Sequence, residues 1–232
     1  MFNLLWGAAF VLVNFMFFLL CYRLFGKKGL YAWIGVATVL ANIQVTKTID
    51  LLGITTTLGN TMYVSMYMAS DLLNEKYGPK EARKAVWFGF FTLIMTTITM
   101  QMVLLFEPTA TDFAQTPMQQ LFGLLPRLAL ASLTAYAVSQ LLDVRLYAWI
   151  RKFFPERHQL WIRGNGSTMI SSFIDTLIFC SIAFYGYAWG IWIELLFTTY
   201  ILKFVLTAAG TPILYIARNF RLIEEEGQAL KP

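Results

Sequence analysis

Long runs of apolar residues, separated by short polar segments, dominate the chain. Seven such runs occupy residues 3–22, 30–49, 58–73, 85–106, 120–142, 167–187 and 191–217. A helix needs roughly 20 apolar residues to cross a bilayer, and in lipid a helix satisfies its own backbone hydrogen bonds. The alternating strands of a membrane β-barrel are missing from the pattern. The sequence therefore predicts an all-α integral membrane protein with about seven transmembrane helices, the third being the shortest and most polar.

Composition supports this class. The chain is 58% hydrophobic and only 13% charged, with a mean hydropathy of +0.60, whereas soluble domains carry about 25% charged residues. This excludes a disordered protein, a nucleic-acid-binding domain and a disulfide scaffold. The net charge of +5 then reflects the placement of loops and not a nucleic-acid partner.

The basic residues fall in alternate connections between the apolar runs. The segments 23–29, 74–84 and 143–166 and the tail after 217 carry three, four, five and three Lys or Arg residues, while the loops around 50–57, 107–119 and 188–190 carry none. Cytoplasmic loops collect Lys and Arg. We therefore expect a multi-pass protein of the cell inner membrane with its N-terminus outside and its C-terminus in the cytoplasm, and we count Arg163 among the loop residues.

Three basic residues remain at membrane depth: Lys47, Arg127 and Lys203. Each costs roughly 2.5–3.5 kcal/mol on insertion scales, so such residues usually mark a pathway or a pair. Lys47 is near the end of its run and is expected to reach the interface. Lys203 and Asp175 lie at similar depth on consecutive runs, which predicts that they meet. They either only neutralise each other or take part in a ligand site.

Other polar residues in the runs are further candidates for ligand contact. Asn42 and Gln44 lie in the second run, Asp71 lies near the inner end of the third, and Tyr136 lies in the fifth. The amide of Asn42 offers donors and acceptors that lipid cannot satisfy.

The motifs that would indicate an enzyme are missing. The chain has no phosphate-binding GxxxxGK[ST] loop and only one histidine, His158, which excludes multi-histidine metal motifs. We expect no cofactor, no metal and no catalytic activity. A solute transporter needs only a cavity with a few fixed polar groups.

Several short motifs resemble the queuosine precursor transporter family, which is related to vitamin uptake transporters. They are Ala41-Asn42, Met68–Gly78 (MASDLLNEKYG), Arg127–Ser132 followed by Ala135-Tyr136, Gln140–Asp143, Ile174–Phe179, and Tyr200–Lys203 with Pro212 after it. The resemblance covers about residues 30–217, and the order and spacing of the motifs make it fairly specific. One departure is Ser172, where the family pattern has an asparagine, and this could alter which ligand is preferred.

The resemblance implies a fold and a function. It implies a six-helix core at 30–220, similar to the substrate-binding subunits of energy-coupling-factor importers, preceded by an extra helix and basic loop at 1–29 and followed by a cytoplasmic tail at 221–232. It also implies import of 7-cyano-7-deazaguanine or 7-aminomethyl-7-deazaguanine, and in some members queuine or queuosine, for tRNA queuosine salvage.

The implied ligand suggests roles for the polar residues. A deazaguanine presents an N1–H and a 2-amino group side by side, and the Asp175 carboxylate can accept both. The O6 carbonyl then needs a donor, which Lys203, Arg127 or Asn42 could supply. Asp71 either orders an inner gate, pairs with a loop cation or contacts the ligand.

Two alternatives stay open. The chain could transport another flat, nitrogen-rich solute such as a vitamin, or it could be a membrane enzyme or assembly protein in which the Asp–Lys pair is structural. The expected partners are a small molecule and membrane lipid, with no nucleic acid. Self-association into a homo-oligomer and the use of a separate energising module are both left open.

Overall fold

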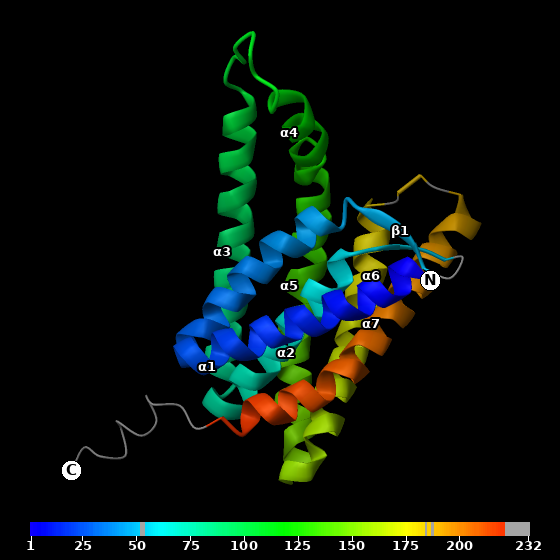
Figure 1. The fold of residues 1–232 in the computed structure, drawn as a ribbon. Helices are drawn as coiled ribbons and strands as arrows, with labels where there is room; N and C mark the ends of the chain where they lie inside the picture. Colours follow the sequence, from blue (N-terminus) through cyan, green and yellow to red (C-terminus); the bar gives the residue numbers. More distant parts are fainter. Residues whose placement is uncertain (52–53, 184, 187, 221–232) are drawn as a thin grey trace, which may run out of the picture.

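The structure, a computed structural model, describes residues 1–51, 54–183, 185–186 and 188–220. Its helices are α1 (Phe2–Gln44), α2 (Gly59–Tyr77), α3 (Pro79–Leu104), α4 (Gln115–Phe122), α5 (Leu125–Phe153), the short 3-10 helix η1 (Arg157–Gln159), α6 (Leu160–Ala183) and α7 (Trp189–Arg218). Strands β1 (Thr48–Leu51) and β2 (Ile54–Thr57) form a small antiparallel hairpin between α1 and α2. The expected all-α integral membrane class is confirmed (Figure 1).

Five stretches of helix in the described residues are long and apolar enough to cross a membrane. Helix α1 counts once among them although it has two arms, which at 1.5 Å per residue are roughly 36 and 27 Å long. Helix α2 is absent from the five because it is too polar. The seven predicted runs thus correspond to the two arms of α1 and to α2, α3, α5, α6 and α7.

A kink at Gly26 divides α1 and replaces the loop expected over 23–29. Gly26 has φ 56° and ψ −136°, a backbone conformation that side chains disfavour and glycine adopts freely. The arms pack closely beside the kink, because a Cβ on Gly29 would lie 2.5 Å from the carbonyl oxygen of Cys21. The chain then turns back toward the β hairpin (Figure 1).

Helix α2 occupies the centre of the bundle. It packs against α1, α3, α5, α6 and α7, and nearly all of its residues are buried. Polar side chains on α2 therefore face neighbouring helices and not lipid, which explains why its sequence is the most polar of the predicted runs.

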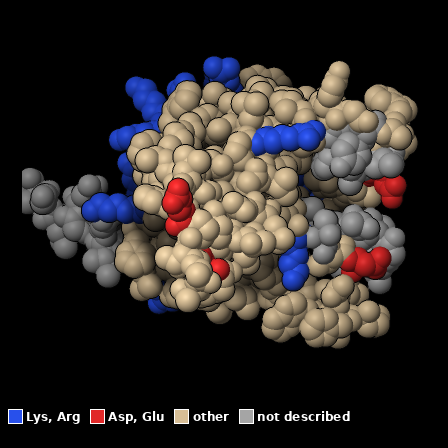
Figure 2. Space-filling view, turned by 90° about the horizontal axis from the view of Figure 1, so that it is seen from above, with Lys and Arg blue, Asp and Glu red and all other residues tan. Residues whose placement is uncertain are grey.

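The two ends of the bundle differ in charge. We call the end with the β hairpin the hairpin end, where the side chain of Asn3 donates to the carbonyl of Asp50. We call the opposite end, with Gly26 and the α2–α3 turn at Gly78, the basic end. It carries Arg23, Lys27, Lys28, Lys76, Lys80, Arg83, Lys84, Arg151, Lys152 and Arg218. Seen from above, lysine and arginine side chains gather mainly toward one edge of a largely neutral surface (Figure 2).

The loop predicted over 143–166 is much shorter in the structure. Helix α5 continues to Phe153 and α6 begins at Leu160, because the polar residues of this segment find partners inside the bundle. Lys47 is exposed in the turn after α1, outside any helix. The division into 1–29, 30–220 and 221–232 stays a prediction, and the proposed tail lies outside the described residues.

Candidate functional site

Polar side chains repeat every fourth residue along the facing sides of α2 and α5. Residues four apart lie one above the other on a helix. The repeats are Tyr63, Tyr67, Asp71 and Glu75 on α2, and Ser139, Asp143, Tyr147 and Arg151 on α5. With partners from α6 and α7 they form three polar layers between the middle of the bundle and its basic end.

The first layer contains the predicted pair. The ammonium nitrogen of Lys203 on α7 lies 2.8 Å from Oδ2 of Asp175 on α6, and it also donates to the hydroxyl of Thr176 at 3.2 Å. The side chains of Lys203 and Asp175 are 6% and 5% exposed. The expectation that these two residues meet is therefore confirmed, and the charges compensate each other in a water-poor interior.

Two tyrosines and a serine extend this layer across α2 and α5. Ser139 donates to Oδ1 of Asp175 at 3.0 Å, Tyr67 donates to Ser139 at 3.1 Å, and the hydroxyls of Tyr63 and Tyr67 are 2.7 Å apart. The ammonium of Lys203 lies over the ring of Tyr63. We call these residues, Tyr63, Tyr67, Ser139, Asp175 and Lys203, the mid-bundle cluster. It offers a carboxylate, a cation and an aromatic face in one place.

The second layer is a pair of carboxylic acids. Asp71 of α2 and Asp143 of α5 are both fully buried, and their carboxyl groups lie within hydrogen-bonding reach of each other. Ser171 donates to Oδ1 of Asp143 at 2.7 Å. Among the described residues Asp71 forms no ion pair, so the structure shows no pairing of Asp71 with a loop cation within that part of the chain. Glu75, one turn further along α2, forms ion pairs with Arg151 and Arg163.

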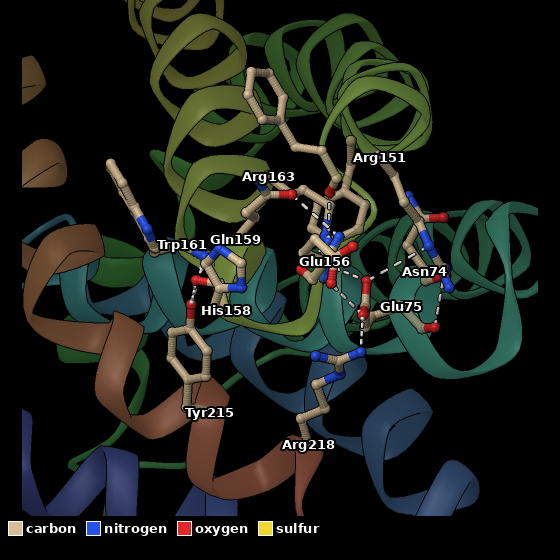
Figure 3. Close-up of polar contacts among 12 residues, drawn as sticks. Asn74, Glu75, Arg151, Glu156, His158, Gln159, Trp161, Arg163, Tyr215 and Arg218 are labelled. Carbon is tan, nitrogen blue, oxygen red and sulfur yellow. Dashed lines mark hydrogen bonds and ion pairs between the residues drawn. The ribbon is translucent and has the colours of Figure 1, made fainter.

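The third layer is built on Glu75 (Figure 3). Its Oε1 forms ion pairs with a guanidinium nitrogen of Arg163 at 2.8 Å and with one of Arg218 at 2.7 Å. Its Oε2 accepts from the hydroxyl of Tyr147 at 2.9 Å, and Arg151 approaches it at 3.8 Å. This Glu75 cluster joins α2, α5, α6 and α7 at the basic end.

The position of Arg163 differs most clearly from what the sequence predicts. It was expected in a cytoplasmic loop, yet it lies on α6 and is 0% exposed. Besides Glu75, its guanidinium donates to the backbone carbonyls of Phe154 and Glu156 at 2.7 and 2.9 Å. A buried guanidinium is tolerated only with such partners, and here the end of α5 supplies two of them.

Three other predicted residues, Asn42, Gln44 and Tyr136, have no described hydrogen bond to the mid-bundle cluster. Asn42 is buried and donates to the carbonyl of Thr38, while its side-chain oxygen has no partner in the described part of the chain. The side-chain oxygen of Gln44 and the hydroxyl of Tyr136 are likewise unpartnered. The Tyr136 ring packs edge-on against Phe90 with centroids 4.9 Å apart.

Arg127 is not part of this region. It is exposed at the hairpin end, where its guanidinium donates to the backbone carbonyl of Ala183 at 2.9 Å. Ala183 is the last residue of α6, and the final carbonyls of a helix lack partners within it. Arg127 therefore closes a helix end, and the structure does not bring it to Asp175 and Lys203.

Sequence reasoning did not select Tyr63, Tyr67, Glu75, Ser139, Asp143 or Arg163 as site residues. The recurrence of polar residues at every fourth position along α2 and α5 is the signal that would have found all of them except Arg163. Within the described ranges, no group of three or more His, Cys, Asp or Glu side chains is arranged to hold a metal ion. The chemistry available is thus hydrogen bonding, charge compensation and stacking.

Comparisons with known proteins assign this arrangement to a family. Residues 57–217 match the family model described as "Putative vitamin uptake transporter". This range contains every residue of the three layers except Arg218. A "Probable queuosine precursor transporter" of Bacillus subtilis is 50% identical over 220 residues, covering 94% of this chain and 96% of the relative. The chain belongs to the queuosine precursor transporter family. It is a multi-pass membrane transporter and not an enzyme, as the sequence predicts.

Two relatives with lower identity align over about three quarters of the chain. A "Probable queuosine precursor transporter" of Haemophilus influenzae is 28% identical over 180 residues, which cover 73% of this chain and 74% of the relative. A "Queuosine precursor transporter" of Escherichia coli is 25% identical over 171 residues, with 72% and 74% covered. No solved structure matches the chain.

Proposed function

We propose that this transporter imports a queuosine precursor, 7-cyano-7-deazaguanine or 7-aminomethyl-7-deazaguanine, and that the mid-bundle cluster binds it. The observation that carries the proposal is the buried Asp175–Lys203 pair beside the ring of Tyr63. The names of the three relatives support the substrate class.

The chemistry of the ligand fits this cluster. The N1–H and 2-amino groups of a deazaguanine are adjacent donors, and the two oxygens of Asp175 accept in parallel. The O6 carbonyl accepts from the ammonium of Lys203, and the flat ring stacks on Tyr63. An adenine-like edge offers Asp175 no adjacent pair of donors and offers Lys203 no carbonyl, so it cannot replace the contacts that a deazaguanine makes, and such a site discriminates against it.

The orientation that we propose assigns the two ends of the bundle to the two sides of the membrane for import. The basic end carries most of the lysines and arginines, whereas the hairpin end carries Asp50, Glu107, Asp112 and Glu194. By the positive-inside rule the basic end faces the cytoplasm, which puts the N-terminus outside the inner membrane. Substrate enters from the hairpin end and leaves past the Glu75 cluster.

Uptake in cells that cannot make deazaguanine tests this function. Such cells, given nanomolar 7-cyano-7-deazaguanine, are expected to regain queuosine in their tRNA when they express the wild-type chain. Asp175→Asn is expected to abolish this while the protein remains in the membrane, and Glu107→Gln, at an exposed loop position, serves as the matched control. If these cells express the wild-type chain and still never regain queuosine, the substrate assignment is refuted.

A vitamin or another flat, nitrogen-rich solute is the second candidate. The description of the matching family model favours it. Competition separates the two: a vitamin that blocks deazaguanine uptake at equal concentration would support the broader specificity, and its failure to compete would support the narrower one.

A further inference from the structure

Two buried carboxylic acids face each other outside the mid-bundle cluster. Asp71 and Asp143 approach from α2 and α5, and each keeps one oxygen that accepts no hydrogen bond among the described residues: Oδ1 of Asp71 and Oδ2 of Asp143. Carboxylate oxygens only accept hydrogen bonds, so contact between two of them needs a donor or a cation between them.

A third unpartnered group points at the same place from α6. The hydroxyl of Thr168 lies beside both carboxyl groups, is 1% exposed, and has no hydrogen-bond partner in the described part of the chain. One turn away, Gly164 lets α6 approach, because a Cβ there would lie 3.4 Å from Oδ2 of Asp71. Three helices thus direct free oxygen atoms at one point.

The cations in the adjoining layers already form ion pairs with other carboxylates. On the side toward the basic end, Arg163 and Arg218 bind Glu75, and on the other side Lys203 binds Asp175. The titratable and charged groups in the two layers that adjoin the pair are Tyr63, Tyr67, Asp175 and Lys203 in the mid-bundle cluster and Glu75, Tyr147, Arg151, Arg163 and Arg218 in the Glu75 cluster. None of these cations forms an ion pair with Asp71 or Asp143 among the described residues.

Two ionised carboxylates in contact inside a water-poor bundle repel each other strongly. The Thr168 hydroxyl can donate to one of them but leaves both charges in place, whereas one proton between the carboxylates removes the repulsion. Three free oxygens are too few for cations such as Ca²⁺ or Mg²⁺, which take six or more ligands. We propose that Asp71 and Asp143 share one proton and that this proton crosses the membrane together with the substrate. The substrate's identity rests on the proposed function; the proton site does not.

The neighbouring layers give the proton a route and a link to the substrate. A cavity of about 10 Å³ adjoins Asp71 and is lined by Tyr67, Asn165, Thr168, Thr207 and Thr211 among others, close to the room that one water molecule needs. A proton leaves water on the outer side, binds a carboxylate oxygen, and is released to cytoplasmic water. Tyr67 and Ser139 lie one turn from Asp71 and Asp143 and connect to Asp175.

Infrared spectroscopy tests the proton directly in the purified full-length protein. The wild type is expected to show the carbonyl stretch of a protonated carboxylic acid at neutral pH, shifted in D₂O. Asp71→Asn and Asp143→Asn are each expected to lose it, because the introduced amide donates to the remaining carboxylate. Glu107→Gln is the matched control and keeps the band. No band in the wild type, or a band that survives in either single variant, would overturn the shared proton.

Proteoliposomes test the coupling without any variant. With one proton per substrate, an outside-acid gradient of about one pH unit supports roughly tenfold accumulation of 7-cyano-7-deazaguanine, since a tenfold ratio corresponds to about 1.4 kcal/mol, and a pH-sensitive dye in the lumen reports acidification. Accumulation driven by a Na⁺ gradient alone, or uptake indifferent to both gradients, would overturn the coupling.

The two proposals fail separately. If deazaguanine neither binds nor enters the vesicles, the substrate assignment fails while the infrared band still decides the proton site. If deazaguanine enters and the wild type shows no protonated carboxyl, the substrate assignment stands and the proton site fails.

Discussion

The ammonium nitrogen of Lys203 lies 3.9 Å from the centre of the Tyr63 ring. At this distance the cation is attracted to the face of the ring, and the same ammonium pairs with Asp175. A flat ligand that stacks on this face of Tyr63 must therefore move Lys203. Binding of such a ligand is therefore expected to change the position of Lys203, which is the only lysine in α7.

Replacing the aromatic ring of Tyr63 tests this relationship. Tyr63→Leu is expected to raise the KM for deazaguanine uptake about 10-fold or more, since a base on an aromatic ring gains about 1–3 kcal/mol. Tyr63→Phe keeps the ring and loses the hydroxyl that contacts Tyr67, so its KM is expected to remain close to that of the wild type. Equal KM values for the Leu and Phe variants would show that Tyr63 does not stack on the ligand.

Removing Lys203 separates its structural contribution from its role in transport. Lys203→Met leaves the buried carboxylate of Asp175 without its cation, which is expected to cost about 3–5 kcal/mol and to lower the melting temperature of the detergent-purified protein. The double variant Asp175→Asn/Lys203→Met removes both charges and is expected to recover most of that loss.

Uptake by the same double variant is the decisive second measurement. A stable double variant that transports nothing agrees with ligand binding by the pair. Normal uptake by this variant, or by a charge-swapped Asp175→Lys/Lys203→Asp variant, would return the pair to a purely structural role.

The Glu75 cluster predicts a large loss of stability from a small change. Glu75→Gln removes the only carboxylate that Arg163 and Arg218 share in the described residues, leaving a fully buried guanidinium without its anion. We expect a destabilisation of about 3–5 kcal/mol, measured as a lower melting temperature against Glu107→Gln. An unchanged melting temperature would mean that the backbone carbonyls of Phe154 and Glu156 suffice for Arg163.

The junction between α1 and α2 is sensitive to a single methyl group. A Cβ on Gly59 would lie 2.6 Å from the carbonyl oxygen of Ala41, and backbone cannot give way as a flexible side chain can. Gly59→Ala is therefore expected to destabilise the protein by about 1–3 kcal/mol. Gly7→Ala is the matched control, because nothing lies within 4 Å of a Cβ at Gly7; equal melting temperatures for the two variants would contradict the prediction.

Much of the fold follows from hydropathy because lipid imposes a simple rule on spanning helices. The apolar runs locate α3, α6 and α7 closely, and the most polar run proves to be the central helix α2. Hydropathy fails where polar residues have partners inside the protein. Arg163 looks like a loop residue because its partner Glu75 is 88 positions away in the sequence.

Part of the site was also predictable, because depth along a helix can be counted. Equal depth on consecutive runs predicted the meeting of Asp175 and Lys203, which the structure confirms. Depth says nothing about which face of a helix a residue occupies, so Arg127 was grouped with them although it is exposed at the end of α6. The roles of Asn42, Gln44, Asp71 and Tyr136 in binding stay predictions.

The enclosure of α2 by its neighbours has a consequence for biosynthesis. A nascent chain that ends after α3 would present Asp71, Asn74 and Glu75 to lipid, which cannot solvate them. Their partners Val144, Tyr147 and Arg163 are synthesised later. The partners that compensate the polar side chains of α2 become available only after α5 and α6 are synthesised. We therefore expect α2 to insert stably together with α5 and α6, late in translation. Chains truncated before α5 are expected to be substrates for membrane proteolysis.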